Sequence, residues 1–227
     1  MSTLFLVATP IGNLNDFSPR AAETLQAADR IACEDTRTSS VLLNQYKINK
    51  PLFSFHQHNE HHKVRHLINL LDGGENIALI SDAGMPGISD PGFLAVRAAH
   101  AGGHVVTVIP GPDACTTALV ASGLPSDRYC FEGFLPPKKG RQTRLKEIAQ
   151  RDVTSVIYES PHRILKILQE LTDHAGEDRL ACVARELTKK YEELNRGRLA
   201  GLSRLWQERD PIKGEFVIVL ASKSYTE

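Results

Sequence analysis

The sequence has no long hydrophobic run, no net charge and no C-x-x-C pair among its 227 residues. The longest apolar run near the start, residues 4–8, is too short for a secretion signal or a membrane span. We therefore expect a cytoplasmic protein with no membrane attachment. The spacing of the four cysteines argues against a disulfide framework and against a zinc site. Cys33 and Cys182 are expected in strands, where a thiol packs as a small apolar group.

The sequence also lacks the loops that bind phosphate-bearing cofactors. Neither G-x-G-x-x-G nor G-x-x-x-x-G-K-[ST] occurs, and no Lys or Arg lies between Arg65 and Arg97. Asp82 and Asp90 fall within that stretch, and Asp113 lies in a second loop. Carboxylates favour a ligand with positive charge or with ribose hydroxyls that need hydrogen-bond acceptors. S-adenosylmethionine fits this pattern, because it has a sulfonium and a ribose but no phosphate.

Three apolar runs end in loops that are rich in glycine and proline. The loops are TPIGN after residue 8, SDAGMPGISDPG after residue 80 and PGPDA after residue 109. Glycine permits positive φ and a close approach of the backbone to a ligand, whereas proline fixes φ. Ligands of open parallel sheets bind beyond the carboxyl ends of the strands, so the pattern predicts one shared pocket. Taken singly, each loop could also be an ordinary strand-to-helix turn.

The order of apolar runs and turn residues predicts two α/β domains, residues 1–122 and 123–227. Strands are expected near Leu4, Ile31, Leu52, Ile77 and Val105, and then near Tyr129, Val153, Leu180 and Phe216. Helices in the first domain are expected to begin near Ser18, Thr38, Asn59, Asp90 and Asp113. The first domain has 8 basic and 11 acidic residues, net −3, and the second has 19 and 16, net +3. The second domain is therefore the better candidate to face a polyanion.

Seven short motifs together resemble one family. They are TPIGNL, CEDTR, SFHQHNE, SDAGMPGISDPG, PGPDA, YESPHR and RELTK, which begin at Thr9, Cys33, Ser54, Ser81, Pro110, Tyr158 and Arg185. In these motifs the chain resembles the ribosomal RNA small subunit methyltransferase I family, part of the wider tetrapyrrole methylase fold. A single motif such as TPIGNL is weak, but the long Asp/Gly/Pro loop followed by YESPHR and RELTK is highly specific. The match covers essentially the whole chain.

This resemblance implies an enzyme that uses S-adenosylmethionine to methylate a ribose 2′-hydroxyl. The implied substrate is a cytidine in the decoding centre of 16S ribosomal RNA, either free or within the small ribosomal subunit. The implied assembly is a homodimer of two α/β domains, with the cofactor in the cleft between the domains. Members of the family usually continue into a small additional C-terminal segment, whereas this chain ends at Glu227. We expect that difference to spare the cofactor pocket and to affect RNA affinity and turnover.

The resemblance and the chemistry also indicate site residues. The cofactor contacts implied by the resemblance are Pro10, Gly12, Asp82, Ala83, Gly84, Ile88, Asp113, Ala114, Tyr158, Ala184 and Gly214. A weakly acidic 2′-hydroxyl needs a proton acceptor, and the strand-end candidates are Glu34, Asp35, Glu159 and Glu186. Each of these carboxylates could equally form a structural ion pair or a helix cap. The RNA contacts expected are Arg37, His56, His58, Lys138, Lys139, Arg141, Arg185 and Lys189.

Two clusters of side chains have competing interpretations. Five histidines lie between His56 and His66, some at i, i+4 spacing. They could bind a metal, face solvent on a helix or, for His56 and His58, contact substrate from a loop. Because Asn59 reads as the N-cap of the helix, His58 lies outside it, and we expect no metal site. The basic run from Lys138 to Lys146 could bind an RNA backbone or be an ordinary solvated helix start.

Two other functions stay open at the level of the sequence. One is a small-molecule methyltransferase of the tetrapyrrole type, which would share the fold and the cofactor. The other is an RNA-binding module without catalysis, in which the glycine-rich loops are only turns. The basic run and the motifs CEDTR, YESPHR and RELTK favour the RNA methyltransferase over the first. The low aromatic content, 6% of residues, argues mildly against single-strand binding as the whole task.

Overall fold

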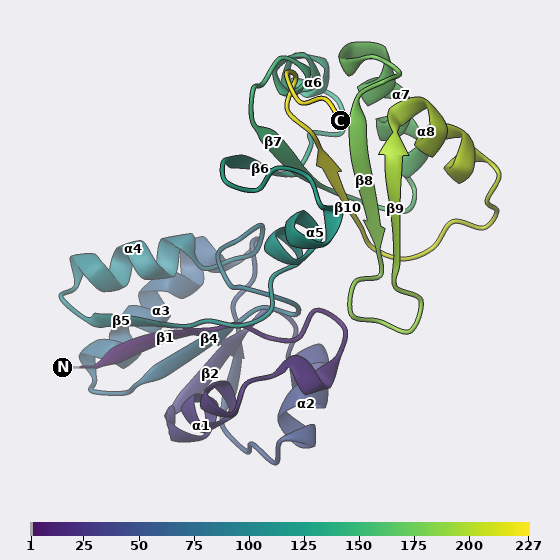
Figure 1. Cartoon of the computed structure of the whole chain (residues 1–227). Helices are drawn as coiled ribbons and strands as arrows, with labels where there is room; N and C mark the ends of the chain where they lie inside the picture. The colour runs from purple at the N-terminus through teal and green to yellow at the C-terminus, as the bar shows by residue number, and fades with distance from the viewer. Residues whose placement is uncertain (1) are drawn as a thin grey trace. The chain divides into compact units, whose positions relative to one another are not determined.

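The computed structural model describes residues 2–227 and divides into two compact units, one ending at Asp113 and the other beginning at Ala114. Each unit has its own five-stranded sheet with helices packed against it (Figure 1). The prediction of two α/β domains is thereby confirmed. Among the helices of the described residues, none has the length and apolar character that a membrane crossing needs.

The first unit is built on a parallel sheet with strand order β3-β2-β4-β1-β5. Its strands are β1 (Thr3–Val7), β2 (Arg30–Cys33), β3 (Leu52–Ser54), β4 (Ile77–Ile80) and β5 (Val105–Ile109). All five lie where the apolar runs predicted them. Every residue of β4 is buried, as expected for a central strand that is covered on both faces.

Helices cover both faces of this sheet, as Figure 1 shows. They are α1 (Pro19–Ala27), α2 (Thr36–Gln45), α3 (Glu60–Asp72) and α4 (Phe93–Ala101), with a short 3₁₀ turn η1 (Leu14–Asp16) before α1. Leu25 of α1 packs with Ile80 in one apolar cluster, and Leu67 of α3 packs with Leu79 in another. Because Leu79 and Ile80 are consecutive in β4, their side chains point to opposite faces. Helices α1 and α2 therefore cover one face, and α3 and α4 cover the other.

The observed helix starts agree with the predicted ones in some places and differ in others. Helix α1 begins after Ser18, whose side chain accepts a hydrogen bond from a backbone N–H of the first turn. Helix α2 begins after Asp35, slightly earlier than expected. The predicted N-cap at Asp90 is wrong, because α4 begins only at Phe93, after a glycine at φ 149°. Between Asp90 and the helix, the glycine-rich loop makes one further turn.

The second unit has a mixed sheet with strand order β6-β7-β10-β8-β9. Its strands are β6 (Tyr129–Phe134), β7 (Thr154–Glu159), β8 (Leu180–Arg185), β9 (Glu193–Arg198) and β10 (Phe216–Leu220). Strands β6 and β7 are parallel, and the other neighbouring pairs are antiparallel. Helices α6 (Arg141–Ala149), α7 (Ile164–Ala175) and α8 (Leu199–Gln207) form a core with this sheet around Trp206. The sequence did not predict β9.

Helix α5 (Ala114–Ser122) belongs to the second unit. It contacts β7, β8, β9 and β10, and it buries Cys115, Ala118 and Leu119. The structural division therefore falls before this helix. The sequence analysis placed the boundary behind the helix, in the linker of residues 122–126. The linker residues connect α5 to β6 within one unit, so a loop rich in glycine and proline does not here mark a domain boundary.

Candidate functional site

The loops after β1 and β4 are joined to each other at the carboxyl edge of the parallel sheet. The backbone N–H of Thr9 donates to the carbonyl oxygen of Gly84 at 2.9 Å, and the Gly84 N–H donates to the Thr9 carbonyl at 3.0 Å. The Thr9 hydroxyl donates to the carbonyl of Ser81 at 3.1 Å. These bonds fix the start of the long Asp/Gly/Pro loop against the TPIGN loop.

Glycine is needed where the loops approach one another. Gly84 has φ 84°, and a Cβ there would lie 3.5 Å from Ile11 Cγ2 and 3.9 Å from the carbonyl oxygen of Pro112. A Cβ at Gly111 would lie only 2.9 Å from the Cβ of Ala8. The loops after β1, β4 and β5 thus meet, and the ligand pocket that their shared composition predicts there stays a prediction. The meeting point is held by backbone, so it can present N–H and carbonyl groups to a ligand.

The sheet topology favours this edge as a ligand site. Strands β1 and β4 are neighbours, but the chain leaves them toward helices on opposite faces, α1 and α4. The neighbours β2 and β4 are likewise followed by α2 and α4 on opposite faces. Such topological switch points open a crevice beyond the carboxyl ends of the strands.

Four carboxylates gather beyond β2 and β4. Asp82 Oδ1 accepts the backbone N–H of Asp35 at 3.1 Å. Partial burial raises the pKa of Asp82 above its usual value although the residue keeps an exposed surface. Burial, followed by repulsion from Asp82, raises the pKa of Glu34. The pKa of Asp90 is raised furthest. Burial is the main cause and the charge of Glu34 the second, and together they raise this pKa to about 7. From the sequence, Asp90 is expected at a helix start. Its raised pKa could not be predicted, because it depends on Glu34, which is distant in the chain.

The histidines of the SFHQHNE motif lie in the loop after β3. His56 interacts electrostatically with Glu34, and its ring centroid is 6.0 Å from that of His58. Helix α3 begins at Glu60 after Asn59, so His58 lies outside it, as predicted. Asn59 makes no side-chain cap bond; its side-chain oxygen instead accepts the N–H of His56 at 2.9 Å. Within residues 2–227, no group of three His, Cys, Asp or Glu side chains could hold a metal ion.

Of the four carboxylates predicted as proton acceptors, Asp35 caps α2. It accepts the N–H of Arg37 at 2.8 Å and pairs with the Arg37 guanidinium at 2.6 Å. The side-chain hydrogen bond from Arg37 is the main cause that lowers the pKa of Asp35 to about 2. A carboxylate this acidic is a weak base. Arg37 itself keeps 89% of its side chain exposed, so it can still meet a polyanion.

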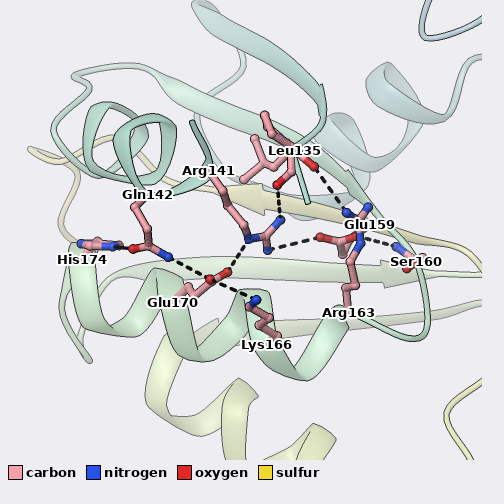
Figure 2. A network of polar contacts seen from close by, with 10 residues as sticks. Leu135, Arg141, Gln142, Glu159, Ser160, Arg163, Lys166, Glu170 and His174 are labelled. Carbon is pink, nitrogen blue, oxygen red and sulfur yellow. Dashed lines mark hydrogen bonds and ion pairs between the residues drawn. The ribbon is translucent and has the colours of Figure 1, made fainter. Parts of the chain in front are cut away.

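Glu159, at the end of β7, lies in the buried network shown in Figure 2. Its side chain is fully buried between two guanidinium groups, with Arg163 Nε at 2.7 Å and Arg141 Nη2 at 3.5 Å. Arg141 also pairs with Glu170 of α7 at 2.7 Å. Buried charges are tolerated when they are paired in this way. The geometry indicates a structural role for Glu159, and its catalytic role stays a prediction.

Glu186 anchors the turn between β8 and β9. Its carboxylate accepts Lys189 Nζ at 3.0 Å and the backbone N–H of Glu215 at 3.0 Å. Burial alone would raise its pKa, but these hydrogen bonds outweigh burial and lower the pKa. Glu186 has φ 50° and Thr188 has φ 65°, which is unusual for residues other than glycine. Gly214 allows this turn, because a Cβ there would lie 2.6 Å from Glu186 Cγ.

The basic run after β6 divides into exposed and buried cations. Lys138 and Lys139 are exposed and form no ion pair with any residue in the described part of the chain. Arg141 is only 2% exposed and forms ion pairs with Glu159 and Glu170. The prediction that Arg141 contacts RNA is therefore corrected to a structural role. Its burial could not be predicted, since its partners come from β7 and α7.

The remaining predicted residues fall in both units. Around the loops of the first unit, Pro10 is buried, Gly12 is exposed and Ile88 is 43% exposed. Asp113 and Ala114 adjoin the start of α5, and Ala83 is exposed beside Asp82. In the second unit, Tyr158 and Ala184 both lie opposite Val217 of β10, so their side chains share one face of the sheet. Arg185 Nε donates to the carbonyl of Lys213 at 2.6 Å.

The chain is similar to known sequences over almost its whole length. The family model described as tetrapyrrole (corrin/porphyrin) methylases matches residues 3–203. The ribosomal RNA small subunit methyltransferase I of Haemophilus influenzae is 50% identical over 223 residues, which are 97% of this chain and 78% of the relative. The protein of the same name from Thermotoga maritima is 42% identical over 223 residues, covering 98% of this chain and 100% of the relative.

Comparison with solved structures supports the fold. The crystal structure of uroporphyrin-III-C-methyltransferase from Thermus thermophilus superposes with a TM-score of 0.68 at 18% identity. It covers 98% of this chain and 96% of its own. At that identity the similarity establishes the two-unit architecture and nothing about the substrate.

Proposed function

Because the chain belongs to the ribosomal RNA small subunit methyltransferase I family, within the tetrapyrrole methylases, we infer that it is an enzyme that methylates small-subunit ribosomal RNA. The observation that carries this conclusion is the 50% identity with a relative of that name over 97% of the chain. We further propose the finer reaction: transfer of the methyl group of S-adenosylmethionine to the 2′-hydroxyl of a cytidine in the decoding centre of 16S ribosomal RNA.

The proposed donor site is the edge where the loops after β1, β4 and β5 meet. S-adenosylmethionine fits the groups present there. The exposed Asp82 supplies negative charge toward a sulfonium or an acceptor toward a ribose hydroxyl, and the partly exposed Ile88 supplies apolar surface. The Thr9 and Gly84 backbone fixes these groups in place. The cofactor contacts of Tyr158, Ala184 and Gly214 remain part of the proposal, as contributions of the second unit.

S-adenosylmethionine supplies an activated methyl group, so the chain must orient the acceptor and remove its proton. A carboxylate that is already held by a cation is a poor acceptor, which disfavours Asp35, Glu159 and Glu186. Asp90 and Glu34 have raised pKa values and face no arginine or lysine in the interactions that shift them. We propose Asp90 as the group that takes the 2′-hydroxyl proton, because it lies in the long Asp/Gly/Pro loop of the proposed donor site, near Glu34 and Asp82. Its pKa of about 7 also suits a base at neutral pH.

The test of the donor site is calorimetric titration with S-adenosylmethionine. Asp82→Asn removes the charge but keeps an oxygen that can accept the N–H of Asp35. We expect it to weaken binding about tenfold, the effect of about 1.4 kcal/mol. Asp72→Asn at the end of α3, where the carboxylate pairs with His104, serves as the control and should bind as the wild type does. Wild-type affinity of Asp82→Asn would contradict the proposed donor site.

The test of the reaction uses small ribosomal subunits and naked 16S RNA that have not been methylated. Label transferred from S-adenosylmethionine would be located by mass spectrometry of RNA fragments. We expect a single 2′-O-methylated cytidine, and methylation of a base instead would contradict the proposal. We also propose that the enzyme is a homodimer and acts in the cytoplasm. The homodimer would be tested by mixing Asp82→Asn chains with Lys139→Glu chains at a concentration of S-adenosylmethionine too low to saturate Asp82→Asn. Recovered activity requires sites shared between subunits.

A further inference from the structure

One face of the second sheet carries an aromatic cluster, of which the proposed donor site uses only Tyr158. The ring centroid of Tyr158 in β7 lies 4.9 Å from that of Phe131 and 5.6 Å from that of Phe134, both in β6. The pairs meet edge to face, at interplanar angles of 71° and 68°. Phe134 lies in the edge strand and leaves 55% of its surface exposed, so its ring is accessible while it packs against Tyr158.

A β-bulge places both phenylalanines on this face. Residues 131 and 134 would point to opposite faces of a regular strand, because they are an odd number of positions apart. The register of β6 shifts between Phe131 and Gly133, and Gly133 has φ 60°. Phe134 then lies opposite Tyr158. The bulged Glu132 is held by Arg144 at 2.7 Å and also pairs with Arg151. Bulges often redirect side chains beside functional sites.

The buried network of Figure 2 fixes the chain that follows Phe134. Arg163 Nη1 donates to the carbonyl of Leu135 at 3.4 Å, and Arg141 Nη1 donates to the carbonyl of Pro136 at 3.3 Å. Both arginines also pair with Glu159, the residue after Tyr158. The loop that ends in the exposed Lys138 and Lys139 is therefore tied to the same strand end that carries the aromatic cluster.

The exposed ring of Phe134 and the exposed Lys138 and Lys139 are suited to one kind of ligand. Proteins bind unpaired nucleotides by stacking the base on an aromatic side chain while cations contact the phosphates. We propose that Phe134 is a stacking platform for an unpaired base of the RNA substrate, supported by Phe131 and Tyr158, with Lys138 and Lys139 on the adjoining phosphates. This inference rests on the proposed function and adds a substrate-binding residue to it.

The test compares variants of the full chain in binding to a fluorescently labelled RNA hairpin with the sequence of the small-subunit decoding centre. Phe134→Ala should weaken binding about tenfold or more, and Phe134→Tyr should keep wild-type affinity, because base stacking needs only the ring. Tyr129→Ala is the matched control: Tyr129 is 42% exposed at the other end of the same strand. S-adenosylmethionine affinity should be unchanged in all three variants. Phe134→Leu, which keeps apolar bulk without a ring, should resemble Phe134→Ala and guards against loss through misfolding.

A hairpin with an abasic nucleotide at the target position completes the test. Phe134→Ala should weaken its binding far less than that of the intact hairpin, because the base that stacks is absent. Equal RNA affinity of Phe134→Ala and wild type would overturn the inference, as would a loss of S-adenosylmethionine affinity equal to the loss for RNA. Weakened methylation of whole subunits with unchanged RNA affinity would also overturn the inference. In that case Phe134 would contact a ribosomal protein. Failure of the wild type to methylate RNA would contradict the proposed function alone, since the binding comparison would still stand.

Discussion

At the scale of single residues, Asp90 shows how neighbours change an ordinary side chain. Its carboxyl group is neutralised by burial and by the charge of Glu34, and its pKa of about 7 lies well above 3.8, the ordinary value for aspartate. The folded state therefore keeps a proton on Asp90 between these two pH values, whereas the unfolded state has lost it. Stability contributed at Asp90 is consequently highest at low pH and declines as pH rises to about 7.

The variant Asp90→Asn tests this linkage, because a neutral amide has no proton to lose. Its stabilising effect on the first unit should grow as pH rises from about 4 to about 7 and should then level off. Allowing for partial exposure of the group, we expect a gain of about 1 kcal/mol at pH 8. Thermal unfolding followed by circular dichroism across this range measures the gain, with Asp16→Asn on the exposed η1 turn as control. A gain that is the same at every pH would refute the linkage.

Gly111 provides a second prediction at this scale, because it lies where two site loops touch. The substitution Gly111→Ala puts a methyl group 2.9 Å from the Cβ of Ala8, so the loops after β1 and β5 must move apart. We expect a loss of about 1–3 kcal/mol in unfolding free energy, the usual result of overpacking. Donor affinity in calorimetric titration should fall with it. Gly103→Ala is a useful contrast, since φ 74° strains the backbone there while the added Cβ meets nothing within 4 Å.

At the scale of elements, the strands and loops that could be predicted are those whose signal lies in residues adjacent in the sequence. The strands of the first unit and its glycine-rich loops follow from apolar runs and from turn residues that lie next to each other. Strand β9, read Glu-Leu-Asn-Arg-Gly-Arg, has no apolar run, and it is a strand only because it pairs with β8 along its whole length. The role of Arg141 was mistaken for the same reason. Its neighbours in sequence are exposed cations, but its partners in space are the buried Glu159 and the partly buried Glu170.

The network around Glu159 holds β7, α6 and α7 together, so breaking it should destabilise the second unit. Glu159→Gln leaves Arg141 and Arg163 without the charge that they share, and we expect a loss of about 3–5 kcal/mol. Asp178→Asn is the matched control, because it breaks the exposed ion pair between Asp178 and Arg198. It should lower the unfolding free energy by less than about 1 kcal/mol. Urea unfolding followed by the fluorescence of Trp206 measures both variants. Similar losses in the two variants would show that burial does not strengthen the network.

At the scale of the whole molecule, each unit has its own apolar core, which is the physical condition for independent folding. The single tryptophan of the chain, Trp206, lies in the core of the second unit and is 1% exposed. Its fluorescence therefore reports on that unit alone. This allows the position of the division, before or after helix α5, to be decided by experiment.

A fragment of residues 114–227 should fold by itself, whereas a fragment of residues 123–227 should not. The reason is that α5 contacts β7 to β10, and the shorter fragment would expose apolar side chains of those strands such as Val156 and Val219. We expect the longer fragment to show blue-shifted tryptophan emission and a cooperative urea transition, and the shorter one to show neither. If both fragments folded equally well, α5 would be a dispensable connector and the boundary would lie in the linker after it. If neither folded, the second core would depend on the first unit despite its separate sheet.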